Sequence, residues 1–217
     1  MTAETTIFSL DAIDAALAAA APSLDEDDQR LAAVVLRLLA AGEPVSMAAA
    51  AAAAGVPGPR AEQVLRSWPA VFWDDHGRVT GFWGLALAEM PHRLGHAGTG
   101  LGAWCAWDPL FLARVIGDLD VATTDPVTGQ AITYHIGDDG AITGASHPGS
   151  VLSFLRPDQP WDDNVITTFC HYVLHFTGPA TAQQWTATHP GTFVLSLADA
   201  AELARRHAAR TFGIPSA

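Results

Sequence analysis

Apolar residues recur at helical spacing in the first part of the chain. Positions three and four apart form one helix face, and this spacing is met by Leu31, Val34, Val35, Leu38 and Leu39. The acidic residues 25–28 suit the start of that helix, where negative charge meets the positive end of the helix dipole. Gly42 predicts its end. The alanine-rich residues 2–21 predict an earlier helix that stops at Pro22.

The next segment predicts two short helices and a β-hairpin. Residues 45–68 contain a Gly/Pro-rich break between two helical patterns. Residues 71–79 contain the sequence Asp-His-Gly at 75–77, and residues 81–87 follow. The apolar runs on either side of Asp-His-Gly indicate a hairpin. Helix, helix–turn–helix and hairpin follow one another in a winged-helix unit. We therefore expect an N-terminal helix or extension over residues 1–24 and a winged-helix-like scaffold module over residues 25–90.

Residues 91–217 predict a mixed α/β region. A helix should begin at Asp108-Pro109, because aspartate can cap a helix and proline suits its first turn. Thr181, by a capping-box pattern, and Ser196 should open two later helices. Alternating or β-branched runs predict strands at 131–136, 141–143, 151–155, 165–176 and 192–197. Residues 91–102, rich in glycine and histidine, are expected to be a connection. The predicted class is α+β, with a mainly antiparallel sheet.

Charge narrows the classes of partner. The chain has 11 basic and 23 acidic residues, a net charge of −12, and no lysine. An acidic surface repels phosphate backbones, which argues against a nucleic-acid partner. The predicted helices in residues 45–68 offer only Arg60 and Arg66 as cations. The winged-helix pattern is therefore interpreted as a reused scaffold, with function to be argued from sites elsewhere.

The hydropathy of the chain argues against a membrane-spanning segment. No apolar run approaches the ~20 residues that span a bilayer. The N-terminus carries Glu4, Asp11 and Asp14 where an export signal would carry basic residues. We expect no membrane partner and a cytoplasmic location.

The chain has only two cysteines, Cys105 and Cys170. Cys105 lies three residues before Asp108 at a predicted helix start, where backbone N–H groups lower a thiol pKa. Asp108 could take the thiol proton and later return it to a substrate atom. Alternatively, Asp108 is an N-cap alone and Cys105 a core cysteine. Two thiolates with a carboxylate suit a thiophilic, two-coordinate metal and the cleavage of a metal–carbon bond.

These segments resemble the organomercurial lyase (alkylmercury lyase) family. Residues 101–111, Leu-Gly-Ala-Trp-Cys-Ala-Trp-Asp-Pro-Leu-Phe, are similar to the family segment that carries the first cysteine and the aspartate. Residues 168–170, Thr-Phe-Cys, resemble the context of the second cysteine, with His175-Phe176 and Trp185 at matching spacing. The resemblance covers roughly residues 25–210 and includes the helix–turn–helix and the segments Gly84–Leu87 and Pro91–Leu94.

The resemblance implies a reaction and a site. Cys105 and Cys170 would attack and hold the mercury of an organomercurial substrate, and Asp108 would carry the proton that ends on carbon. The same three residues are the expected mercury ligands. The products would be a hydrocarbon and Hg²⁺, which leaves to a small thiol or a mercuric reductase. No organic cofactor is implied, but excess cytosolic thiol is expected as a co-reactant.

The chain departs from the family at two positions. His171 stands where family members often have another cysteine, next to the second catalytic one. A further family cysteine is absent from residues 123–126, which are Thr-Thr-Asp-Pro. Neither position is expected to be essential, but both bear on the stability of the protein and on the transfer of Hg²⁺ to its acceptor.

Three other interpretations compete. A zinc site would use His171 with His175, or His92 with His96, yet four-residue spacing aligns side chains on a helix and not on a strand. A Cys–His hydrolase would need a histidine beside one cysteine and an oxyanion hole, and would leave the other cysteine unexplained. The third interpretation is a non-catalytic Hg or Cu binding protein or a metal-sensing regulator on the same scaffold. A regulator would need a basic recognition helix, which the sequence lacks.

Overall fold

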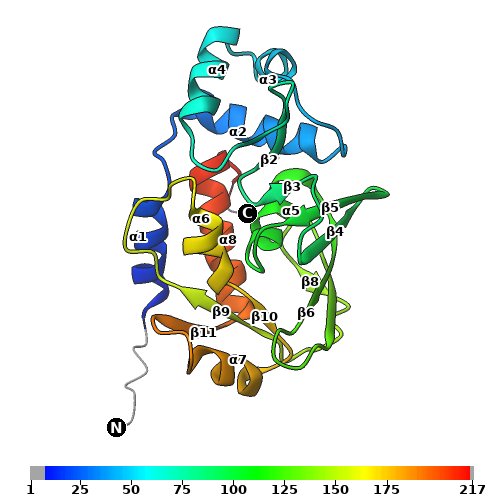
Figure 1. The fold of residues 1–217 in the computed structure, drawn as a ribbon, viewed down its shortest axis with the longest axis vertical. Coiled ribbons are helices and arrows are strands. Elements are labelled where there is room, and N and C mark those ends of the chain that lie inside the picture. Colours follow the sequence, from blue (N-terminus) through cyan, green and yellow to red (C-terminus); the bar gives the residue numbers. More distant parts are fainter. Residues whose placement is uncertain (1–7, 216–217) are drawn as a thin grey trace.

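The computed structural model describes residues 8–215, which form mixed helices and antiparallel sheets (Figure 1). The helices are α1 (Leu10–Ala20), α2 (Glu26–Leu39), α3 (Met47–Ala54), α4 (Gly58–Ser67), α5 (Asp108–Ile116), α6 (Val165–Thr168), the 3₁₀ turn η1 (Cys170–Tyr172), α7 (Pro179–Thr186) and α8 (Leu197–Phe212). The strands are β1 (Phe72–Trp73), β2 (Val79–Phe82), β3 (Leu85–Ala86), β4 (His92–His96), β5 (Thr99–Ala103), β6 (Leu119–Thr124), β7 (Ala131–Ile136), β8 (Ile142–Thr143), β9 (Val151–Leu155), β10 (His175–Phe176) and β11 (Thr192–Ser196).

The strands form two sheets. The larger has the order β1-β2-β3-β5-β4-β6-β7-β8, and the smaller has the order β10-β9-β11. Neighbouring strands pair antiparallel in both sheets. Helix α5 leaves the larger sheet after β5 and packs on α8 and α2 (Figure 1). The predicted α+β class with a mainly antiparallel sheet is confirmed.

The N-terminal helices follow the predicted order. Asp25 caps α2, and Leu31, Leu36 and Leu39 on its inner face are buried. α3 and α4 follow, with Gly55 in the left-handed conformation between them, and then the β1–β2 hairpin. Their buried residues join the same hydrophobic cluster as those of α5 and α8. The likeness to a winged-helix unit and the division at residue 90 stay predictions.

The expected central strand over residues 165–176 is wrong. The segment folds as α6, then η1, and only His175 and Phe176 are paired as β10. The carbonyl of Asn164 accepts the N–H and the hydroxyl of both Thr167 and Thr168. These local hydrogen bonds compete with a sheet ladder and override the β propensity of the segment.

The expected connection over residues 91–102 is also wrong, because these residues form the β4–β5 hairpin. Ala97 and Gly98 both have positive φ, as a tight hairpin turn requires. Gly102 fits where an added Cβ would lie 2.6 Å from the carbonyl oxygen of Ala88. Glycines thus permit close backbone approach in this sheet, and they hide its alternating pattern. Strand β6 was not predicted.

Helix starts were predicted with mixed success. Ser196 caps α8 as expected. α7 begins at Pro179, so the capping-box prediction at Thr181 is wrong. Helix α1 begins only at Leu10, after the cap Ser9, and the first six residues of the helix predicted over 2–21 lie outside the described residues. Within residues 8–215, no helix has the length and hydropathy needed to cross a membrane.

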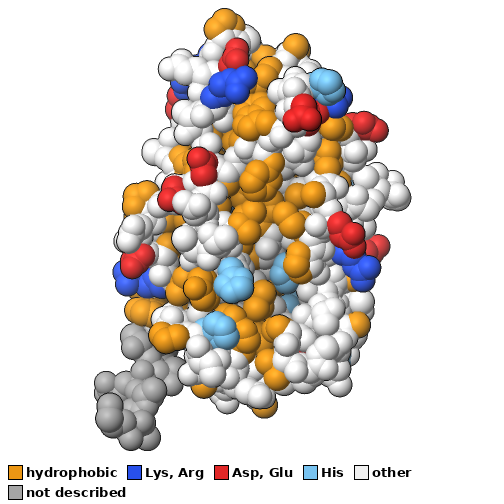
Figure 2. Space-filling view, in the orientation of Figure 1, with side chains coloured by type: hydrophobic (Ala, Val, Ile, Leu, Met, Phe, Trp, Pro, Cys, Tyr) orange, Lys and Arg blue, Asp and Glu red, His pale blue; other side chains and the backbone are white. Residues whose placement is uncertain are grey.

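Hydrophobic side chains gather in a band along the middle of one face, and the charged side chains lie mostly to either side of it (Figure 2). Several arginines form ion pairs with acids: Arg206 contacts both Asp11 and Glu202, and Arg60 contacts Asp28.

Asp125 is a buried carboxylate that connects the β6–β7 turn to α7. It accepts hydrogen bonds from the backbone N–H groups of Val127, Thr128 and Thr177, and from the hydroxyls of Thr177 and Thr181. Burial alone would raise its pKa, but these donors outweigh burial and lower the pKa to about 2.

We expect Asp125→Asn to destabilise the fold by about 1–3 kcal/mol near neutral pH, because an amide leaves donors of this buried set unpaired. The lowered pKa stabilises the fold above the unfolded aspartate pKa of about 3.9. That contribution is lost as the pH falls toward 2. Urea unfolding of both proteins at pH 7 and pH 3 tests this, with exposed Asp138→Asn as control. An equal stability gap at both pH values would contradict it.

Candidate functional site

Cys105 and Asp108 lie in the turn that joins β5 to α5. The Cys105 backbone N–H donates to Asp108 Oδ2 at 2.6 Å, so the carboxylate faces back into the turn. The residue that precedes the helix is Trp107, and it makes no capping bond. The helix start was predicted correctly, but the N-cap interpretation of Asp108 is wrong. Its carboxylate is committed to the segment that carries Cys105.

Cys170 reaches this turn from the opposite side of the fold. It is the first residue of η1, and Val173 directly follows η1. The carbonyl oxygen of Val173 accepts the Ala106 N–H at 3.0 Å, which ties the Cys170 segment to the Cys105 turn. One sulfur or carboxylate oxygen from each of Cys105, Asp108 and Cys170 lies within 4.8 Å of the others. Among residues 8–215 this is the one such group of potential metal ligands. The structure thus brings together the three residues singled out from the sequence.

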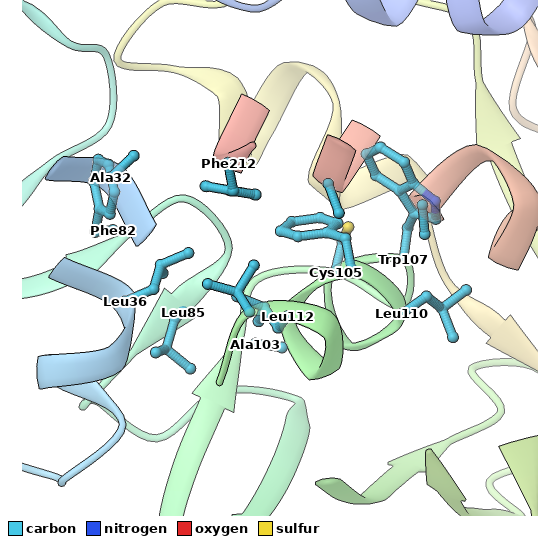
Figure 3. Close-up of a cluster of buried hydrophobic side chains, with 14 of the residues drawn as sticks. Ala32, Leu36, Phe82, Leu85, Ala103, Cys105, Trp107, Leu110, Leu112 and Phe212 are labelled. Carbon is cyan, nitrogen blue, oxygen red and sulfur yellow. The ribbon is translucent and has the colours of Figure 1, made fainter. Parts of the chain in front are cut away.

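All three side chains are buried. Cys105 is 0% exposed, and Cys170 and Asp108 are each 4% exposed. Figure 3 shows the Cys105 sulfur surrounded by hydrophobic side chains, with Trp107 and Leu110 nearby on the same turn and helix. A charged group is poorly solvated in such surroundings, so each of these acids is pushed toward its neutral form.

The pKa values follow from this burial. Burial raises the pKa of Cys105 well above its usual value, aided by the hydrogen bond to Cys170 and the charge of Asp108. The Cys105 bond favours the Cys170 thiolate, yet burial and Asp108 together still raise the Cys170 pKa. Burial raises the pKa of Asp108 to about 7 despite its bond from the Cys105 N–H. The expectation that the helix N-terminus lowers the Cys105 pKa is therefore wrong in the free protein.

An apolar cavity opens beside the cluster. Asp108 and Cys170 contribute to its wall, and Cys105 does not line it. Much of the remaining wall is aromatic: Trp83, Trp104, Trp107, Phe111, Trp161, Phe169 and His207. Such a cavity suits an uncharged organic group and excludes water from the reacting atoms.

The turn between β2 and β3 closes one side of the site. Gly84 has φ +88, and a Cβ there would lie 2.7 Å from Asp108 Cγ and 2.9 Å from Oδ1. Only glycine allows this approach. Its neighbour Trp83 has φ +43, a conformation that costs an L-residue about 1–2 kcal/mol. Neither residue was predicted to belong to the site, although a glycine beside a tryptophan at a hairpin turn was a usable signal.

The histidines do not form a zinc site. His171 is exposed and packs edge-on to Tyr172. His175 is buried beside Ser150, and His92 is buried beside Thr123. None of them belongs to a group of potential metal ligands within residues 8–215. His207 was missed entirely, because a lone histidine on an amphipathic helix carries no distinguishing pattern.

Known proteins are similar to this chain in sequence and in fold. The family model described as alkylmercury lyase matches residues 85–209. An alkylmercury lyase of Staphylococcus epidermidis is 36% identical over 177 residues, 81% of this chain and 80% of that protein. One of Pseudomonas putida is 34% identical over 167 residues, 76% of this chain and 77% of that protein.

A solved structure, the mercury-bound form of MerB2, has the same fold. It superposes with a TM-score of 0.71, at 17% identity, over 92% of this chain and 96% of that one. The family model covers more than half of the chain and spans the segments that carry the two cysteines and the aspartate, and the sequence relatives cover most of the chain. The chain belongs to the alkylmercury lyase family.

Proposed function

We propose that this chain cleaves the carbon–mercury bond of organomercurials by protonolysis, with Cys105 and Cys170 as mercury ligands and Asp108 as proton carrier. The observation that carries the proposal is the buried cluster, in which two sulfurs and a carboxylate oxygen lie within 4.8 Å of one another. Thiolates are the ligands that soft metals prefer. The solved MerB2 structure, which has this fold, is mercury-bound.

In the first step one thiol displaces the ligand X from R–Hg–X. A sulfur–mercury bond forms, the mercury–X bond breaks, and the thiol proton leaves with X as HX. The organic group R enters the aromatic cavity, where its apolar surface is removed from water. Which cysteine attacks first is not fixed by the cluster, because both lie within reach of the same point.

In the second step the other thiol binds the metal and passes its proton to Asp108. Electron density from two sulfurs then weakens the carbon–mercury bond. Asp108 returns the proton to carbon, and the electron pair of the broken bond becomes the new C–H bond. The overall change is R–Hg–X plus two thiols to R–H, HX and Hg²⁺ held by two thiolates.

The raised pKa values suit this sequence. A carboxyl with a pKa of about 7 is balanced between accepting and donating a proton near neutral pH. Both thiols stay protonated until mercury binds, and one of these thiol protons is the proton that ends on carbon. The buried site therefore stores the reacting proton within the protein.

Release of Hg²⁺ requires competing thiols. Two small thiols, or the thiols of a mercuric reductase, would take the metal and return both cysteines to their protonated form. We infer that the chain works in a thiol-rich compartment such as the cytoplasm, without an organic cofactor. We further propose that residues 25–90 are a winged-helix-like scaffold. They support the site through the Trp83–Gly84 turn, and residues 91–217 are the catalytic region.

The first prediction concerns the three site residues. With phenylmercury and excess thiol, we expect benzene release from wild type, loss of at least about a hundredfold in Cys105→Ser and Cys170→Ser, and a similar loss in Asp108→Ala. Gas chromatography follows benzene, and exposed Asp138→Ala is the matched control for the aspartate. Stoichiometric mercury binding by wild type without benzene would instead indicate a metal-binding or metal-sensing protein.

The second prediction is a pH dependence. Asp108 must be ionised to accept the thiol proton, so single-turnover benzene release should fall about tenfold per pH unit below its pKa of about 7. Release should level off above that pH. A single-turnover experiment with enzyme in excess and pre-bound phenylmercury isolates this step. A profile that is flat from pH 5 to pH 9 would assign the proton to another group.

A further inference from the structure

His207 lies in the wall of the aromatic cavity without a role in the steps above. It is 1% exposed and comes from α8, far along the chain from the cysteine turn. Its ring lies 5.1 Å from the ring of Trp107 and 4.9 Å from that of Phe111, centroid to centroid. A buried titratable group among aromatic rings needs a partner, and the structure supplies one.

The partner is the strained residue Trp83. Its indole Nε1–H lies 3.2 Å from His207 Nε2. An indole N–H can only donate, so Nε2 must carry the lone pair and the imidazole is neutral with its proton on Nδ1. Nδ1 lies 3.4 Å from the hydroxyl of Thr211, one turn along α8. Burial, with a smaller effect of Arg210, lowers the His207 pKa to about 3, which agrees with the neutral form.

Trp83 is attached directly to the backbone that touches Asp108. Gly84 is the next residue, and its Cα approaches the Asp108 carboxyl so closely that a Cβ would overlap Cγ. The Gly84 carbonyl also accepts the Trp104 N–H at 3.0 Å, next to Cys105. A left-handed aromatic residue persists only where its surroundings hold it. The bond to His207 holds Trp83 together with its packing on Trp68, Phe82 and Phe212.

We propose that His207 is a positioning residue, which accepts the Trp83 indole N–H and thereby holds the Trp83–Gly84 turn against Asp108. The turn limits the orientations of the carboxyl, so that one oxygen stays on the Cys105 N–H and the group keeps its distance from both sulfurs. This inference rests on the proton-carrying role proposed for Asp108. It adds that α8, which bears none of the reacting groups, sets the geometry of proton transfer.

Three variants test the pair. His207→Phe keeps an aromatic ring and removes the acceptor, and Trp83→Phe keeps a ring and removes the donor. Each single change removes the Trp83–His207 hydrogen bond and leaves the other buried polar group without this partner. The double variant replaces both partners by apolar rings. The double variant should therefore regain much of the thermal stability that His207→Phe loses. His207→Gln retains an acceptor and is the rescue variant.

The expected result separates positioning from stability. We expect kcat for benzene release from phenylmercury to fall about tenfold in both single variants and in the double variant. His207→Gln should recover most of the loss. Recovery of kcat in the double variant together with stability would overturn the proposal, because packing alone would then explain the single variants. Unchanged kcat in His207→Phe would also overturn it.

A readout without turnover keeps this test apart from the proposed function. The Asp108 carboxyl can be titrated by infrared difference spectroscopy against Asp108→Asn in the metal-free protein. In His207→Phe we expect its pKa to move upward from about 7, because a looser carboxyl shares less of the Cys105 N–H bond. An unchanged Asp108 pKa in His207→Phe would overturn the positioning role. Absence of benzene from wild type would count against the lyase proposal alone.

Discussion

The hydrogen bond between the Cys105 N–H and the Asp108 carboxylate organises the site. It holds the Asp108 carboxyl inside an apolar core and orients it toward the turn that carries Cys105. Keeping that carboxyl ionised disfavours the folded state: a pKa raised to about 7, against about 3.9 in an unfolded chain, corresponds to roughly 4 kcal/mol at high pH. The remaining core must outweigh this cost, and its buried apolar residues extend from α1 to α8.

The two halves of the site are joined by backbone as well as by side chains. Ala106, between the cysteine and the aspartate, donates to Val173, which follows the turn carrying Cys170. Val173 is fully buried, and its neighbour Leu174 is bound through backbone and side-chain contacts to Ser153 of β9. The smaller sheet thus fixes the second cysteine, while the larger sheet and α5 fix the first.

The sequence was sufficient to single out the three residues that the structure brings together in the buried cluster, and to predict most helices. Cys105, Asp108 and Cys170 were identified together because two lone cysteines and a carboxylate in family-like contexts are a specific combination. The local structure around Cys170 was predicted wrongly, since β-branched residues hid the hydrogen bonds to the Asn164 carbonyl. The sequence could not show the importance of Gly84 and His207, because it depends on contacts with distant residues: Gly84 lies against Asp108, and His207 bonds to Trp83.

Complete burial of the first thiol has a kinetic meaning. Cys105 is 0% exposed and does not line the cavity, so in the proposed mechanism a mercurial reaches its sulfur only when neighbouring side chains or the segment bearing Cys170 move aside. The frequency of that opening sets an upper limit on turnover, however fast the bond cleavage is. The same barrier protects the Cys105 sulfur from oxidants and bulky alkylating reagents, since these too must wait for the opening. The rate of opening therefore limits which reagents reach Cys105, and this selectivity is separate from how well the organic group fits the cavity.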